Sequence, residues 1–224
     1  PTNPFLVFHN FAIQISPTES YSVGDKLGFT YSLNGTKQLG HSANLNDYTD
    51  MTTYGCNALY RDFMPNYLIS MDYNMVKEIL DKKIHYQTTF YTQHDNRVDK
   101  IAEDGDPINF FWGFKETNDS GNSALRLALQ NKHDIVYMIG FDYSDGPSKL
   151  PNVYSGTNNY GKYHIYPAAS MKETEWRNRL SRILNDYPNQ KIIRVVGTKN
   201  LDVKKSNYYE ITPEQFKEIY DSAN

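Results

Sequence analysis

Short apolar segments alternate with helical segments along most of this chain, and this alternation constrains the fold more than any other feature. Residues 135–139 form the most continuous apolar run and end at Gly140, which is typical of a strand buried on both faces. Residues 74–82 place four apolar side chains on one helical face. Repeated alternation of this kind predicts an α/β fold with a single doubly wound, mainly parallel (Rossmann-like) sheet.

The same patterns assign further elements. Apolar or alternating segments predict strands at residues 27–33, 51–54, 67–71, 84–91 and 191–196. Helical spacing predicts helices at residues 123–131 and 171–185, and Thr212 followed by Pro213 predicts the start of a last helix.

A chain of 224 residues is short for two ordinary domains, so we expect one Rossmann-like domain at residues 27–224. Residues 1–26 are irregular, with short apolar pieces between turn formers, and predict an N-terminal arm or an added hairpin. Residues 144–167 are rich in Gly, Pro and Asn. A loop of this length is typical of a lid or a binding loop.

The composition limits the classes of function that this chain can have. The formal net charge of −3 argues against a large electrostatic interface with nucleic acid, and no apolar run is long enough to predict a transmembrane segment. Cys56 is the only cysteine, which excludes an intramolecular disulfide and favours a reducing, cytoplasmic location. The 19 tyrosines suit contacts with sugars, nucleotides or proteins, and they also fit a tyrosine-rich core rim. The sequence leaves open whether the protein forms a homo-oligomer.

Parallel sheets bind ligands beyond the carboxyl ends of their strands, and four turns of this chain are expected there. The first, Asn34-Gly35-Thr36, would offer backbone N–H groups to a phosphate or a base, or form an ordinary turn. The second contains Asn57, whose amide can pair with a nucleobase or a ribose, or cap its own loop.

The other two turns lie later in the chain. Ser120 and Gly121 precede a predicted helix, whose N-terminus favours an anion, although helix capping explains these residues too. Gly140 and Asp142 follow the strand at residues 135–139. Glycine there permits a close approach of a ligand, and a carboxylate can accept hydrogen bonds from ribose or sugar hydroxyls.

The order of these turns resembles that of the bacterial lipooligosaccharide sialyltransferases and the related motility-accessory-factor domains. The shared pattern is an Asn-Gly turn after the first strand, a Cys-Asn step, a Ser-Gly helix start and a strand ending in Gly-x-Asp. The chain carries this pattern at Asn34-Gly35-Thr36, Cys56-Asn57, Asp119-Ser120-Gly121 and Gly140-Phe141-Asp142, and the likeness runs over residues 27–196.

The resemblance implies a nucleotide-sugar-dependent glycosyltransferase. Its donor would be a compound such as cytidine monophosphate-sialic acid, it would need no metal or other cofactor, and it would transfer the sugar to a hydroxyl of a glycan acceptor. The residues that would bind the donor are Asn34, Gly35, Thr36, Asn57, Ser120, Gly121, Gly140, Asp142, Tyr143, Tyr154 and Tyr160. The tyrosines would contact the phosphate, and His164 would be the base that deprotonates the acceptor.

The chain also departs from the family pattern. Leu33 stands where the family has Gly, residues 116–117 hold no counterpart of the family's Arg, and His164 lies farther from the next helix. A second hypothesis is therefore a non-catalytic α/β binding or structural module, for example of a virus particle. A pterin-type pyrophosphokinase on the same fold is the third.

The acidic stretch at residues 103–106 contains an Asp-x-Asp spacing, which holds a divalent cation in many other glycosyltransferases. Its flanks are polar and not strand-like, which favours an acidic surface loop. The histidines lack the spacing of zinc ligands, so we expect no metal site.

Overall fold

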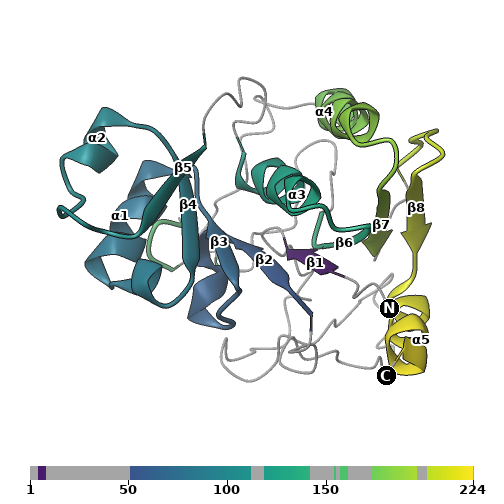
Figure 1. The fold of residues 1–224 in the computed structure, drawn as a ribbon, viewed down its shortest axis with the longest axis horizontal. Coiled ribbons are helices and arrows are strands. Elements are labelled where there is room, and N and C mark those ends of the chain that lie inside the picture. The colour runs from purple at the N-terminus through teal and green to yellow at the C-terminus, as the bar shows by residue number, and fades with distance from the viewer. Residues whose placement is uncertain are drawn as a thin grey trace.

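The structure is a computed structural model that describes residues 5–8, 51–111, 119–141, 154, 157–160, 173–195 and 201–223. Eight parallel strands form one sheet in the order β5-β4-β3-β2-β1-β6-β7-β8 (Figure 1). The strands are β1 (Phe5–Phe8), β2 (Thr53–Cys56), β3 (Tyr67–Ile69), β4 (Thr89–Gln93), β5 (Ile108–Phe111), β6 (Ile135–Ile139), β7 (Lys191–Val195) and β8 (Tyr208–Ile211).

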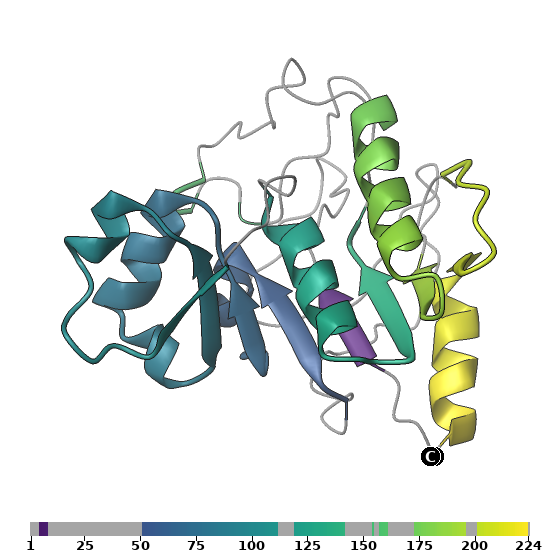
Figure 2. The ribbon, with the colours of Figure 1, turned by 45° about the horizontal axis from the view of Figure 1, so that its top comes forward.

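Helices cover both faces of this sheet. The α-helices are α1 (Tyr73–Asp81), α2 (Asn96–Asp99), α3 (Ser120–Gln130), α4 (Glu173–Asp186) and α5 (Pro213–Ala223), and the 3-10 helices are η2 (Asn57–Arg61) and η3 (Ile84–Tyr86). Figure 2 shows α3 and α4 in front of the sheet and α1 behind it. The fold is therefore the expected Rossmann-like, doubly wound α/β fold.

The core consists of apolar layers on the two faces of the sheet. Side chains of α3 and α4, including Leu125 and Leu180, pack against Val136 and Ile192 on one face. On the other face Leu68 and Phe90 pack with α1, while Tyr137 and Val195 pack with Phe216 of α5. Alternate residues of β6 thus face opposite layers, which explains why its whole sequence is apolar.

The direction of chain growth reverses between β1 and β6. From β1 the chain adds β2 to β5 on one side, then returns to add β6, β7 and β8 on the other. In open α/β sheets such a switch point opens a crevice at the carboxyl ends of the two strands. Any ligand site of this fold is expected at that edge.

Most predicted elements occur within two or three residues of their expected bounds, and β6 matches residues 135–139 fully. The prediction of a strand at residues 84–91 was wrong in its first half. The helix η3 occupies that half, and β4 begins only at Thr89. The strands β5 and β8 and the one-turn helix α2 were not predicted. The strand predicted at residues 27–33 lies outside the described residues.

The prediction of an arm or hairpin at residues 1–26 needs a correction for Phe5–Phe8. This segment is β1, and it pairs in parallel with both β2 and β6 in the middle of the sheet. Four consecutive apolar residues suffice for a central strand because neighbours satisfy its backbone on both sides. No helix in the described part of the chain is long and apolar enough to cross a membrane.

Candidate functional site

Asn57 lies where β2 ends and η2 begins, at the carboxyl edge of the sheet. Its φ of 53° is in the left-handed region, which Asn tolerates better than most residues. In this conformation the residue is only 3% exposed. The chain thus buries an amide group beside the strand ends, where a buried polar group needs partners.

Two serines from separate segments supply these partners. The hydroxyls of Ser70, just after β3, and of Ser120, at the start of α3, each donate to Asn57 Oδ1 over 2.9 Å. Ser120 Oγ also accepts from the N–H of Met71 over 3.0 Å. We call Asn57, Ser70 and Ser120 the amide cluster. Both hydrogen bonds of Asn57 use its carbonyl oxygen, so within the described residues its two amide N–H donors stay available.

The start of α3 is capped from within the protein. The Asp119 carboxylate accepts from the backbone N–H of Asn122 over 2.8 Å. The backbone carbonyl of Asp119 accepts from the N–H of Ser123. Arg179 of α4 lies 3.2 Å from the Asp119 carboxylate and offsets its charge. A carboxylate at this helix start competes with an anionic ligand, so the anion site expected at Ser120 is not favoured.

Cys56 precedes Asn57 and is fully buried. Its Sγ donates to the backbone carbonyl of Ser120 over 3.3 Å. Burial raises the pKa of the Cys56 thiol, and the nearby Asp119 carboxylate adds to the effect. The thiol is therefore protonated at neutral pH, the form that is a poor nucleophile.

Gly140 follows β6 on the far side of the switch point. Its φ of 77° lies in the region that favours glycine, and the next residue, Phe141, is buried in the core. The prediction that Gly140 sits at the carboxyl end of a buried strand is met by this geometry. Asp142 and Tyr143, which come next in the sequence, lie outside the described residues.

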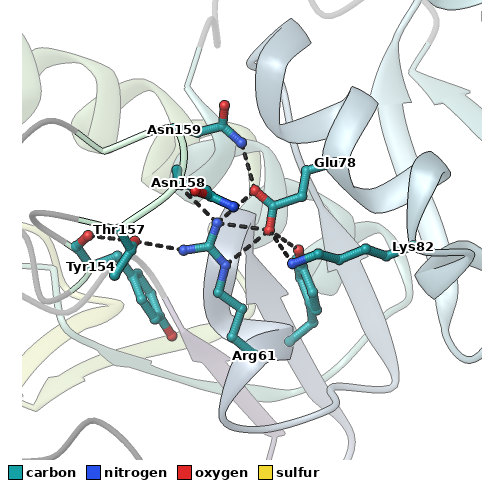
Figure 3. Close-up of polar contacts among 8 residues, drawn as sticks. Arg61, Glu78, Lys82, Tyr154, Thr157, Asn158 and Asn159 are labelled. Carbon is teal, nitrogen blue, oxygen red and sulfur yellow. Dashed lines mark hydrogen bonds and ion pairs between the residues drawn. The ribbon is translucent and has the colours of Figure 1, made fainter.

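A second polar cluster lies at the other end of η2 (Figure 3). Arg61 Nη2 is 2.6 Å from Oε2 of Glu78 on α1, and Lys82 Nζ donates to Oε1 over 2.8 Å. Arg61 also donates to the Thr157 hydroxyl and to the Asn158 carbonyl, at 2.7 and 2.9 Å. We call Arg61, Glu78 and Lys82 the ionic cluster. It fastens the turn at residues 157–160 to η2 and α1.

The Glu78 carboxylate is almost fully enclosed by donors. Tyr60 donates to it, as do Arg61, Lys82 and the amide of Asn159. Burial raises the pKa of Glu78, but the hydrogen bonds and the Arg61 charge outweigh burial and lower that pKa to about 2. The carboxylate is therefore ionised at neutral pH, and its charge is compensated.

Tyr154 and Tyr160 were predicted to contact the donor phosphate. Both are buried in the apolar layer under α1, their ring centroids lie 5.8 Å apart, and each ring lies near the Arg61 guanidinium. Burial and the nearby Asp62 carboxylate raise the pKa of Tyr154. The structure assigns these rings to the core beside the ionic cluster.

Among the predicted site residues, the structure brings Asn57 and Ser120 into direct contact, with Gly121 buried behind Ser120. The predicted site residues that lie outside the described residues are Asn34, Gly35, Thr36, Asp142, Tyr143 and His164. Ser70 was missed because the sequence pattern places it inside the predicted strand at residues 67–71, whereas β3 ends at Ile69. No sequence pattern indicates the ionic cluster, because its residues come from segments that are far apart in the sequence.

The described residues contain no group of three or more side chains suited to a metal ion. In the acidic stretch, Asp106 accepts from Tyr86, from His85 and from the N–H of Glu103. Burial raises the pKa of Asp106, but these hydrogen bonds outweigh burial and lower it. Its carboxylate therefore ties the loop to η3.

Comparison of the chain with protein-family models, with curated proteins and with solved structures finds no match. The geometry of the site and the physical chemistry of its residues therefore carry the functional argument.

Proposed function

We propose that the protein is a nucleotide-sugar-dependent glycosyltransferase of the sialyltransferase-like type, and that it binds its donor at the carboxyl edge of the sheet. The observation that carries the proposal is the contact between Asn57 and Ser120. These residues were selected as donor-binding from separate segments, and their side chains lie 2.9 Å apart at the edge where such folds bind nucleotides.

The amide cluster suits the neutral part of a nucleotide. Asn57 has its oxygen occupied by two hydroxyls and its N–H donors available, so it can donate to a base carbonyl or to a ribose oxygen. The serines hold the amide in one orientation before the ligand arrives. Such preorganisation lowers the entropy cost of binding.

The donor phosphate would bind elsewhere. Asp119 already caps the N–H groups at the start of α3, and Arg61 is compensated by Glu78. The proposal therefore assigns the phosphate to Tyr143 and the ribose hydroxyls to Asp142, and it does not include Tyr154 or Tyr160. His164 would accept the proton of the acceptor hydroxyl, in a transfer that needs no metal.

One observation favours a second function, a non-catalytic binding or structural module. The tyrosines expected to stabilise the leaving phosphate, Tyr154 and Tyr160, serve the core instead. A protein that kept the nucleotide fold without its chemistry would retain the amide cluster and lose such residues.

Calorimetry with cytidine and uridine nucleotides, followed by a sugar-transfer assay, separates the two functions. We expect a cytidine nucleotide to bind, and Asn57→Gly to weaken that binding about tenfold, because one charge-free hydrogen-bonding group is worth about 1.4 kcal/mol. Lys77→Met, on the exposed face of α1, is the matched control and should bind normally.

Absence of binding by every nucleotide would overturn the donor site. Binding without transfer, in the wild-type protein and with several acceptor sugars, would favour the module. If transfer occurs, His164→Ala should abolish it while nucleotide affinity is retained. Transfer that survives this substitution would exclude His164 as the base.

A further inference from the structure

Arg194 is a buried charged residue that the proposed chemistry does not use. It lies on β7, between Met138 of β6 and Glu210 of β8, and only 1% of it is exposed. Its neighbour two residues earlier, Ile192, faces the same side of the sheet and packs in the core. An arginine at this position therefore stands where the fold otherwise places an apolar side chain.

Within the described part of the chain, two groups bind the guanidinium. Nε donates to the backbone carbonyl of Phe141 over 2.6 Å, and Nη1 donates to Glu210 Oε1 over 2.9 Å. Glu210 is fixed in turn, because it accepts from the Tyr208 hydroxyl and from the N–H of Leu201. Burial and the hydrogen bond to Glu210 raise the pKa of Tyr208, so this phenol stays a donor.

Stability alone does not account for this arrangement. A buried ion pair loses about as much solvation energy as its attraction returns, and apolar side chains of similar volume often replace such a pair without loss of stability. What a pair of apolar side chains could not provide is the short, charge-assisted hydrogen bond from Arg194 to the Phe141 carbonyl. That carbonyl belongs to the residue after Gly140, at the end of β6 and beside the switch point.

We infer that Arg194, oriented by Glu210, is a positioning residue that fixes the direction in which the chain leaves β6 at the ligand-binding edge. Gly140 has a left-handed φ of 77° and lacks a side chain to restrict it, so its turn needs an external constraint. The guanidinium supplies that constraint from the neighbouring strand. The consequence for donor affinity rests on the proposed function, whereas the constraint on the turn does not.

The double variant Arg194→Met, Glu210→Leu tests the inference, because it removes both charges and keeps the volume. Amide hydrogen exchange of the ligand-free protein is measured first. We expect exchange at Gly140 and Phe141 to rise about tenfold or more, while exchange in α3 is unchanged. Unchanged exchange at these two amides would overturn the inference.

The matched control is Arg126→Met, Asp186→Leu, which removes the 2.9 Å ion pair between α3 and α4. It should leave exchange at the end of β6 unaltered. Arg194→Lys serves if the double variant fails to fold. It retains the charge without the planar fork, and it should give a smaller rise at the same amides. No rise in this variant, if it is the one that folds, overturns the inference.

Nucleotide affinity is measured second, with cytidine monophosphate as the probe. If the wild-type protein binds it, the variant should bind about tenfold more weakly, because a displaced site residue is costly. Equal affinity together with raised exchange would overturn the link between the turn and the donor. If the wild-type protein binds no nucleotide, the proposed function fails, and the exchange data still decide whether Arg194 positions the turn.

Discussion

The two ends of the five-residue helix η2 make polar contacts of opposite character. At its first residue, Asn57 joins the amide cluster, in which every partner is neutral. At its last residue, Arg61 joins the ionic cluster with Glu78 and Lys82. The amide cluster is buried, whereas in the ionic cluster Glu78 is buried and Lys82 is half exposed. Both clusters connect segments that are distant in the sequence.

The difference lies in what each cluster leaves available. Both oxygens of Glu78 accept hydrogen bonds, and Arg61 donates to Glu78, Thr157 and Asn158. The ionic cluster is thus self-contained and suits fastening. In the amide cluster two hydroxyls occupy the oxygen of Asn57, and within the described residues its N–H donors are available, so this cluster suits recognition of a ligand. A ligand is therefore expected at the first residue of η2 and not at the last.

Removing one charge from the ionic cluster should have the largest effect on stability. In Glu78→Leu the Arg61 guanidinium stays largely buried without its main partner, which should lower the free energy of unfolding by about 4 kcal/mol. Urea denaturation measures the loss. The double variant Arg61→Met, Glu78→Leu should recover most of it. Equal losses in the single and double variants would contradict a cluster based on charge compensation.

The ionic cluster should also make stability depend on pH. Because the pKa of Glu78 is about 2 in the folded protein and higher in the unfolded chain, the unfolded state takes up a proton first as the pH falls. The contribution is complete above about pH 5 and is lost as the pH falls toward 2, by at most about 3 kcal/mol. Urea denaturation across this range should show the loss.

The variants decide where this pH dependence originates. Glu78→Leu should reduce it strongly, and Asn57→Gly should retain it, because the amide cluster contains no titrating group. A pH dependence that Glu78→Leu leaves intact would place its source in other carboxylates.

Substitutions in the amide cluster should lower the free energy of unfolding less than Glu78→Leu does, and the loss should not depend on salt. Asn57→Gly removes the acceptor of two buried hydroxyls and should cost about 2 kcal/mol. Asn57→Ala should cost about 1 kcal/mol more, because alanine is strained at a φ of 53°. Urea denaturation at low and high salt measures both. A marked salt dependence would contradict the neutral character of this cluster.

The fold could be predicted from the sequence because the patterns that indicate its strands and helices are local. The apolar run at residues 135–139 and the helical spacing at 74–82 each appear in one short window, and both segments fold as predicted. Phe5–Phe8 shows where this fails. Four residues carry too little pattern to identify a central strand, and its place in the sheet depends on pairing with distant strands.

The candidate site was predicted in part, for a related reason. Asn57 and Ser120 could be chosen because residues at strand ends and helix starts of such a sheet share one edge. The partners Arg61 and Glu78 could not, since nothing in their own surroundings relates them to residues 157–160. Tyr154 and Tyr160 were assigned to a phosphate from a resemblance, and their apolar surroundings only appear in three dimensions.

The smallest expected effect concerns Lys82, and it tests how the charge of Glu78 is compensated. Lys82 is 48% exposed, so water screens its interaction with Glu78, and Lys82→Met should cost only about 0.5 kcal/mol. Lys77→Met, which breaks an exposed pair with Asp81 on the same helix, is the control and should cost no more. Both losses should shrink at high salt. If Lys82→Met instead cost as much as Glu78→Leu, the lysine would be an essential member of the cluster, and the assignment of Arg61 as the main compensating charge would be wrong.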